Sequence, residues 1–416
     1  MPTSPGAKVL VIGCGVAGPV VACLLKQKGY RPIVFERAPA PGDIGQSIII
    51  APNGMKVLAK ACPSVVDRFL EYGPPVCEFR EHKASGEVLG WFETGWEERY
   101  GKPGVGAKRT TATAWLRDAL VEVGIEIRDG WGLERIEEAE DGGSVTAFFD
   151  GGRSETGLFL VGCDGLKSAT RRLLLDRGGL KDGEPSFTGI CQTGGLAPTP
   201  ASFRDHRGVR NYYGESLHFV CYDISHETVS WGLTQRAETG TEAAWGLFDD
   251  ASRQKTTEGL GSMFENQGWD PTVVKMIRGA TRLIRYGIFD RPELPSEQWF
   301  SGRCVMVGDA VHPTSTHLGQ GANQACEDCY YLAEALPSFD LAKPPISTSE
   351  LSEAFRGYAE KQQPHTSHLV KAARAVGELR VTGPEGREAR DKLVAERVGD
   401  RARIDAHYDF QFRRPY

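Results

Sequence analysis

The sequence predicts an α/β fold made of a Rossmann-type domain, an inserted and mostly antiparallel sheet, and a C-terminal helical segment. Near the N-terminus, the apolar run KVLVIG (8–13) leads through a glycine-rich turn into a helix, and RPIVFER (31–37) follows as a second strand. From about 184 to 285, short alternating stretches separated by turn residues indicate antiparallel strands. From about 350 onwards the pattern is helical, polar and charged.

The composition is that of an ordinary globular protein. The chain has 416 residues, which is long enough for about two domains, and a formal net charge of −6, which gives no reason to expect nucleic acid or an anionic membrane as a partner. No apolar run approaches the roughly 18 residues of a membrane span, and the start MPTSPGAK lacks the pattern of a signal peptide. Ten cysteines without framework spacing favour reduced thiols, so we expect a cytoplasmic protein.

The first strand and helix enclose the motif GCGVAG (13–18), and the helix is expected from Ala17 to Gly29. Gly13 permits the tight turn, Gly15 lets a pyrophosphate approach the backbone, and Gly18 lets the helix pack closely on the strand. Glu36 ends the second strand, where a carboxylate accepts ribose hydroxyls and disfavours a 2′-phosphate. This site is therefore expected to hold FAD or NAD rather than NADP.

The middle of the chain continues with a helix over 110–124 and with strands in IEIRDG, GSVTAFFDGG and TGLFLVGCDG, read as a meander that returns to the main sheet. The last of these strands runs into the Asp-Gly pair at 164–165, followed by a helix start. The pair is either a cofactor contact or a surface turn in which the aspartate caps the helix.

A third segment, RCVMVGDAVHPTSTHLGQGANQACED, covers residues 303–328. Asp309 lies at a strand end, where its carboxylate can bond ribityl or ribose hydroxyls. Gly319, Gly321 and Asn323 leave backbone N–H groups open at the next helix start, which favours a negative charge such as that of a reduced flavin ring. Cys326 and Cys329 form a C-x-x-C within this helix, and packing is the favoured interpretation over zinc or redox chemistry.

The three segments, in this order and spacing, resemble the para-hydroxybenzoate hydroxylase family of FAD-dependent aromatic monooxygenases, in particular its salicylate-hydroxylase-like members. GIFDRPELP (287–295) is similar to a further family segment. The resemblance covers most of residues 5–335 and is weak over about 185–285 and over the tail.

The resemblance implies which residues contact FAD. The ADP half would lie against the first motif and Glu36, Asp309 would bond the ribityl–pyrophosphate region, and the loop at 45–46 and the helix start at 321–323 would face the flavin ring. Ala112 stands where the family usually has Leu, which weakens the match around Arg109. The implied cofactor-binding residues are Gly13, Gly15, Val16, Ala17, Gly18, Glu36, Arg37, Gly45, Gln46, Arg109, Asp164, Gly165, Asp309, Gly319, Gly321, Ala322 and Asn323.

The resemblance also implies the reaction. NADPH or NADH would reduce FAD, and O₂ would form a flavin hydroperoxide that hydroxylates or epoxidises an electron-rich aromatic molecule of phenol, indole or polyketide type. Only one Rossmann fingerprint is present, so NAD(P)H is expected to bind without a Rossmann unit of its own. A flavin-binding protein without oxygenase activity and an FAD amine oxidase are the alternatives. We expect a monomer or a homodimer without a metal ion.

The expected domains are discontinuous. Residues 1–75, 105–183 and 286–345 would form the FAD-binding domain, residues 76–104 and 184–285 the substrate domain, and residues 346–416 the C-terminal helices and tail.

The substrate residues are predicted from the stretch SLHFVCYDI (216–224). Period-two alternation places His218, Val220, Tyr222 and Ile224 on one face and Leu217, Phe219 and Cys221 on the other. We expect His218 and Tyr222 to face the substrate, where either can bond or deprotonate a substrate hydroxyl. The alternative is a buried tyrosine with a satisfied hydroxyl and a histidine at the surface. In the nearby stretch GVRNYYG, Arg210 and Tyr212 likewise share a face.

Overall fold

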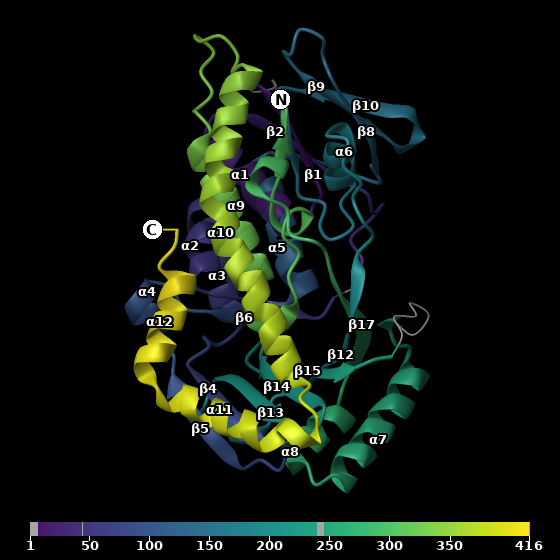
Figure 1. The fold of residues 1–416 in the computed structure, drawn as a ribbon, viewed down its shortest axis with the longest axis vertical. Coiled ribbons are helices and arrows are strands. Elements are labelled where there is room, and N and C mark those ends of the chain that lie inside the picture. Colours follow the sequence, from purple (N-terminus) through teal and green to yellow (C-terminus); the bar gives the residue numbers. More distant parts are fainter. Residues whose placement is uncertain (1–6, 44, 239–244, 416) are drawn as a thin grey trace.

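The computed structural model describes residues 7–43, 45–238 and 245–415. Two large sheets lie in opposite halves of the molecule, one around β1 and β2 and the other around β12, β14 and β15 (Figure 1). The long helix α10 (Thr348–Arg380) extends along both halves (Figure 1). Residues that hold a cofactor and residues that hold a substrate can therefore come from different sheets.

The six-stranded sheet forms the Rossmann-type half. Its strands are parallel except for β18, and the order is β18 (Phe300–Ser301), β19 (Cys304–Met306), β11 (Phe159–Gly162), β1 (Lys8–Ile12), β2 (Arg31–Glu36) and β7 (Glu126–Asp129). The central strands are buried on both faces, and Val9, Leu10 and Val11 have no exposed surface. This burial explains why these strands are continuous apolar runs in the sequence.

The eight-stranded sheet is antiparallel except where β13 pairs with β4. The order is β16 (Gly246–Leu247), β17 (Arg282–Asp290), β12 (Ser186–Pro198), β15 (Thr228–Arg236), β14 (Leu217–Asp223), β13 (Gly208–Tyr213), β4 (Glu78–Lys83) and β5 (Val88–Glu93). Helices α7 (Asp250–Asn266) and α8 (Pro271–Arg278) cover one face with a shared apolar core, and the strand-based interpretation of this region missed both helices.

The predicted meander is partly right. β7 and β11 belong to the main sheet, but the chain between them forms a separate antiparallel sheet of β8 (Leu133–Glu138), β9 (Val145–Phe149) and β10 (Arg153–Gly157). A two-stranded sheet of β3 (Ser47–Ile50) and β6 (Val105–Lys108) completes the strands that position the site.

The helices complete the predicted fold class, which the structure confirms. Helix α1 packs against α9 and α5 beside the main sheet, and α11 packs on β4 and β5. The bounds not yet given are α1 (Ala17–Gln27), α2 (Pro52–Ala61), α3 (Pro63–Tyr72), α4 (Trp96–Tyr100), α5 (Arg109–Glu122), α6 (Ala169–Arg177), α9 (Gly321–Ala335), α11 (Arg387–Gly399) and α12 (Arg401–Phe412).

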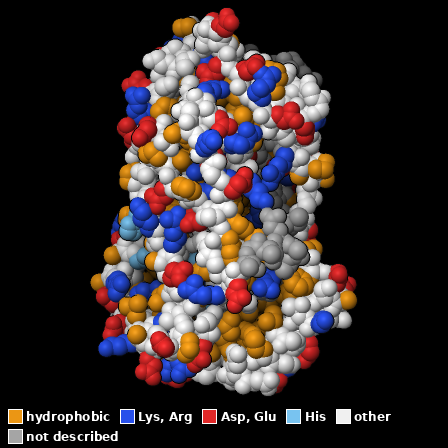
Figure 2. Space-filling model, turned by 45° about the vertical axis from the view of Figure 1, so that its right-hand side comes forward, with side chains coloured by type: hydrophobic (Ala, Val, Ile, Leu, Met, Phe, Trp, Pro, Cys, Tyr) orange, Lys and Arg blue, Asp and Glu red, His pale blue; other side chains and the backbone are white. Residues whose placement is uncertain are grey.

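The strands of residues 76–104 and 184–285 share the eight-stranded sheet, but β17 crosses the predicted boundary at 285–286. The domain division itself stays a prediction. Figure 2 shows lysine and arginine side chains gathered over the middle of one face, with a hydrophobic patch nearer the end that holds the eight-stranded sheet. Within the described ranges, no helix is long and apolar enough to cross a membrane.

Candidate functional site

The three glycines of the first turn have different surroundings. A Cβ on Gly13, whose φ is +103°, would lie 2.5 Å from the carbonyl oxygen of Cys163, and a Cβ on Gly18 would lie 1.9 Å from the carbonyl oxygen of Gly13. A Cβ on Gly15 would meet no atom within 4 Å. Gly13 and Gly18 are therefore required by packing, whereas Gly15 borders open space beside the start of α1, as a pyrophosphate site needs.

Helices α1 and α9 start at the two glycine-rich segments without a side-chain cap. Side chains cap α6, α7 and α8, whereas α1 and α9, like α2, α3 and α5, begin without a side-chain hydrogen bond and without an acidic residue in the first turn. Their first N–H groups are orphan donors, which attract an anion. The pyrophosphate of FAD fits at α1, and the negatively polarised edge of a flavin ring fits at Gly321 and Ala322 of α9.

Glu36 is placed at the end of β2 by its own neighbours. One carboxylate oxygen accepts the N–H of Cys14 at 2.9 Å, and the other accepts the N–H of Ala38 at 3.0 Å. The carboxylate thus spans from β2 to the glycine turn. Each oxygen keeps a lone pair for a ribose hydroxyl. Arg37 beside it is exposed.

Asp309 follows β19 in a short helical turn and accepts no hydrogen bond from any residue that the structure describes. Its side chain is exposed, but the surrounding protein still removes part of its hydration. The resulting desolvation raises the pKa of its carboxyl, Asp328 adds to this effect, and His312 and Arg109 oppose it. An unpartnered carboxylate at this strand end fits a group that supplies hydroxyls, as the ribityl chain of FAD does.

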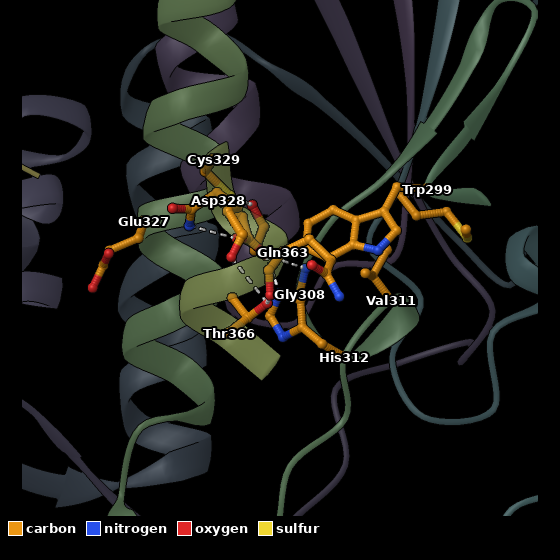
Figure 3. A network of polar contacts seen from close by, with 12 residues as sticks. Trp299, Gly308, Val311, His312, Glu327, Asp328, Cys329, Gln363 and Thr366 are labelled. Carbon is orange, nitrogen blue, oxygen red and sulfur yellow. Dashed lines mark hydrogen bonds and ion pairs between the residues drawn. The ribbon is translucent and has the colours of Figure 1, made fainter. Parts of the chain in front are cut away.

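A buried network supports the backbone next to Asp309 (Figure 3). One oxygen of Asp328 accepts the N–H of Gly308 at 2.8 Å and faces the Nε2 of His312 at 2.6 Å, and the other accepts the Nε2–H of Gln362 from α10 at 2.8 Å. Burial lowers the pKa of His312, but Asp328 and Asp309 outweigh it, so the pKa is raised overall. The network ties the loop, α9 and α10 together.

Two of the predicted cofactor side chains are engaged within the chain. The carboxylate of Asp164 accepts the hydroxyl of Ser168 at 2.5 Å and the N–H and hydroxyl of Thr170 at 2.9 and 3.0 Å. The amide of Asn323 bonds Ala51, Ile49 and Gly319. Asp164 thus caps α6 and Asn323 joins α9 to β3. Their contacts with FAD, and that of Gly165, stay predictions.

The loop at 45–46 reaches across to the eight-stranded sheet. The backbone N–H of Arg109, whose side chain is exposed, donates to the carbonyl of Gln46 at 3.0 Å. The Nε2–H of Gln46 donates to the carbonyl of Trp231 at 2.5 Å, and the hydroxyl of Tyr286 lies 2.9 Å from the Oε1 of Gln46. This hydroxyl also contacts the Oε1 of Gln192.

Thr316, the first residue of the short helical turn at 316–318, donates its hydroxyl to the same Gln192 oxygen at 3.3 Å. Sequence reasoning missed Gln192, Tyr286 and Thr316. The only signal was their position, since Thr316 precedes the glycine segment and Tyr286 precedes GIFDRPELP.

The alternation predicted for β14 is confirmed. Phe219 and Cys221 lie in the core with α7 and α8, whereas Val220 and Tyr222 pack on the opposite face with Trp96 and Phe412. The predicted grouping of Arg210 with Tyr212 is also correct, but Tyr212 packs with Phe219 on the α7 side, away from Tyr222.

Tyr222 is partly exposed and its hydroxyl lies 2.6 Å from the Oγ of Ser47, which donates to the Oγ of Ser230 at 2.5 Å. Burial raises the pKa of Tyr222 to about 12 against the effect of these two serines. His218 has no exposed surface, so its alternative placement at the protein surface is wrong. Sequence reasoning did not find Ser47 and Ser230, which come from β3 and β15.

Comparison with known proteins assigns the family. A family model described as "FAD binding domain" matches residues 6–339. The chain belongs to the FAD binding domain family. The 3-amino-4-hydroxybenzoate 2-monooxygenase of Streptomyces cremeus is 30% identical over 396 residues, which cover 92% of this chain and 90% of the relative. The 3-hydroxybenzoate 6-hydroxylase of Klebsiella oxytoca is 27% identical, with coverage of 93% and 92%.

The fold of this family member is shared with solved structures. A crystal structure of Klebsiella pneumoniae HpxO complexed with FAD and uric acid has a TM-score of 0.81, at 24% identity and with 98% of each chain covered. The predicted cofactor, FAD, and the predicted class, an FAD-dependent monooxygenase, are confirmed. Cys326 and Cys329 are buried in α9, and the described residues contain no group of side chains suited to a metal ion.

Proposed function

We propose that this monooxygenase hydroxylates an electron-rich, phenol-type aromatic molecule between the flavin-holding segments and the face of the eight-stranded sheet that carries Tyr222. The observation that carries the proposal is the chain of hydroxyls from Tyr222 through Ser47 to Ser230. It begins at the side chain of Tyr222, which is partly exposed. Such a chain can bond a substrate hydroxyl and fix the orientation of its ring.

FAD would be held by the glycine turn and Glu36 at its ADP half, by Asp309 and Arg109 in the middle, and by the start of α9 at its ring. Bound FAD would supply the redox chemistry, namely hydride acceptance from NADPH or NADH and the activation of O₂. The protein's own residues would position the substrate, exclude water and accept the hydroxyl proton of the substrate.

We assign to His218 the role of accepting the hydroxyl proton of the substrate. The Nδ1 of His218 is buried and has no partner among the described residues, and it lies four residues before Tyr222 on the same strand face. Removing the hydroxyl proton of a phenol raises the electron density of its ring, and this favours attack by an electrophilic oxygen. His218 would accept that proton, while Tyr222, four residues or about 13 Å further along the strand, would bond a second polar group of the substrate and orient it.

The side chains nearest Tyr222 favour a substrate without a carboxylate. The partly exposed or exposed uncharged side chains on this face and on the loop opposite are Gln46, Ser47, Val220, Tyr222, Tyr286 and Thr316, and the cation on the same face of β17, Arg282, is engaged by Asp43 and the carbonyl of Gly45. Several relatives are named for benzoates, and a carboxylate there would call for a cationic partner. We therefore infer a neutral phenol of the kind found in secondary metabolism.

The test uses the purified, FAD-loaded chain with a panel of hydroxybenzoates and of neutral phenols. Product, NAD(P)H consumption and hydrogen peroxide are measured together. We expect neutral phenols to stimulate NAD(P)H oxidation and to gain an oxygen atom from ¹⁸O₂. Efficient turnover of hydroxybenzoates alone would contradict the substrate class, and stimulation without any oxygenated product would favour a flavoprotein without oxygenase activity on these compounds.

The roles of His218 and Tyr222 are tested with the variants His218→Gln and Tyr222→Phe. Both should keep FAD and NAD(P)H oxidation but release more hydrogen peroxide and about tenfold less product per NAD(P)H. Leu217→Met, on the opposite face of β14, is the matched control and should behave as wild type. Wild-type coupling in both variants would exclude this face as the substrate contact.

A further inference from the structure

His218 is the end of a hydrogen-bonded chain that crosses three neighbouring strands. Its Nε2 lies 3.0 Å from the Oδ1 of Asn211 on β13, and the Nδ2–H of Asn211 donates to the Oε1 of Glu81 on β4 at 3.3 Å. Asn211 and Glu81 are direct cross-strand partners in the parallel pair. All three side chains are buried, with at most 4% of their surface exposed.

The chain of donors and acceptors has one direction. The hydroxyl of Tyr213 donates to the Oε2 of Glu81 at 2.9 Å, and the guanidinium of Arg397 on α11 lies 3.6 Å from its Oε1, so Glu81 is surrounded by donors and acts as an acceptor. The Nδ2 of Asn211 must then face Glu81, and its Oδ1 must face His218. Because an amide oxygen only accepts, the Nε2 of His218 carries a proton.

The ring of His218 is held neutral. Burial lowers its pKa well below the ordinary value, and the cationic groups facing it, Arg380 of α10 and Arg390 and Arg397 of α11, act in the same direction, as does His317. The ring of Tyr213 packs against it with centroids 4.9 Å apart. A neutral imidazole protonated on Nε2 has its lone pair on Nδ1.

We infer that Asn211 and Glu81 are positioning residues that fix the tautomer of His218, so that its basic Nδ1 is presented to a substrate hydroxyl. The inference rests on the proposed function, in which His218 accepts the proton of a phenol. The Nδ1 of His218 is buried without a partner among the described residues, so an O–H donor there would remove an unsatisfied acceptor.

The proton transfer balances without further groups. The substrate O–H bond breaks, its proton binds Nδ1, and the substrate becomes a phenolate while the imidazole becomes an imidazolium. The Nε2–H bond to Asn211 persists and strengthens, because the donor is now charged. The carboxylate of Glu81, which follows Asn211 in the hydrogen-bonded chain, lowers the free-energy cost of burying this imidazolium.

The direct test is ¹⁵N NMR of the FAD-loaded chain with selectively labelled histidine. The signals of His218 are assigned by their loss in His218→Gln. We expect Nε2 protonated and Nδ1 unprotonated in the wild type, in Tyr213→Phe and in Asn211→Asp, which keeps an acceptor. Asn211→Leu should give a mixture of the two tautomers. Protonation on Nδ1 in the wild type, or an unchanged single tautomer in Asn211→Leu, would overturn the inference.

The kinetic readout uses product per NAD(P)H with the best phenol of the panel as a function of pH. Asn211→Leu should lower this ratio about tenfold. In Asn211→Asp the added negative charge should raise the pKa of His218, so the acid side of the profile should move to higher pH. Tyr213→Phe removes a bond from the same Glu81 carboxylate without touching Asn211, and should keep wild-type coupling and an unshifted profile.

The two proposals fail in different ways. If the NMR shows the Nε2 tautomer and its dependence on Asn211, but His218→Gln couples as wild type, the proton-acceptor role of the proposed function is wrong and the tautomer assignment stands. If His218→Gln is uncoupled but Asn211→Leu leaves the tautomer and the pH profile unchanged, Asn211 and Glu81 are merely structural.

Discussion

Asp164 and Asp309 end neighbouring parallel strands, β11 and β19, of the same six-stranded sheet. Both follow a buried apolar run, and both were predicted to contact FAD. In the structure Asp164 accepts three hydrogen bonds from Ser168 and Thr170, whereas Asp309 accepts none from the described residues. Desolvation by the surrounding protein raises the pKa of both carboxyls.

The difference comes from the residues that follow each aspartate. After Asp164, Ser168 and Thr170 supply two hydroxyls and Thr170 supplies an N–H from the first turn of α6, so the carboxylate helps to cap this helix. Four residues after Asp309 stands Pro313, which has no donor, and the Oγ of Ser315, six residues after it, has no partner among the described residues. A carboxylate left without partners at a strand end remains available to a ligand.

The largest expected effect contrasts Gly15 with Gly18. Gly15→Val should lower FAD affinity at least 100-fold and leave the apo protein folded, because the side chain enters the open space that a pyrophosphate needs. Gly18→Val should prevent folding, since its side chain would collide with the backbone of Gly13. Flavin content after purification and the melting temperature separate the two outcomes. A folded Gly15→Val protein with full flavin content would refute this assignment.

Asp164→Ala is the next test. It should lower the free energy of unfolding by about 2 kcal/mol, because the N–H of Thr170 in the first turn of α6 and the hydroxyls of Ser168 and Thr170 lose their acceptor, although Ser168 still caps the N–H of Arg171. Urea unfolding of the apo protein measures this, with Asp164→Asn as a milder control that retains one acceptor. A large loss of FAD affinity without a loss of stability would instead support the role implied by the family resemblance.

Asp309→Ala should show the reverse pattern. FAD affinity should fall about tenfold, which corresponds to the loss of one or two hydrogen bonds to cofactor hydroxyls. The melting temperature of the apo protein should not fall, because the exposed carboxylate that is removed has no hydrogen-bond partner among the described residues. Fluorescence titration with FAD and a thermal melt of the apo form measure the two quantities. Unchanged affinity together with a lower melting temperature would identify Asp309 as a loop cap.

A third carboxylate, that of Glu327 in α9, is fully buried and gives the smallest effect. Burial raises its pKa to about 7 despite the amide N–H of Asn53, which donates to it at 2.6 Å. Between the ordinary carboxyl pKa and about 7 the folded state binds the extra proton, so stability is present at low pH and is lost as the pH rises through about 7.

Glu327→Gln keeps the acceptor for Asn53 and cannot ionise. It should therefore be more stable than wild type at pH 8 by on the order of 1 kcal/mol, and the gain should shrink towards pH 5. Thermal melts of both proteins at several pH values measure this difference. A gain that is independent of pH, or a loss at pH 8, would show that the pKa of Glu327 is not raised in the folded state.

The sequence by itself determined the segments whose geometry is local. The turn at 13–18 lies within a few residues of its strand and helix, and glycine spacing there reports backbone clearance directly. The same holds for Glu36 at the end of β2, for the uncapped start of α9, and for the face that His218 shares with Tyr222, because strand alternation fixes it.

Only the tertiary structure decided which distant side chains meet. Gln46 reaches Trp231 across 185 residues, and Asn211 reaches Glu81 across 130. Such pairs depend on strand order and register in the eight-stranded sheet, which a single sequence does not encode as a local pattern. The free carboxylate of Asp309 and the engaged one of Asp164 also differ only once every nearby donor is placed, because a carboxylate bonds whichever donors the fold brings within reach.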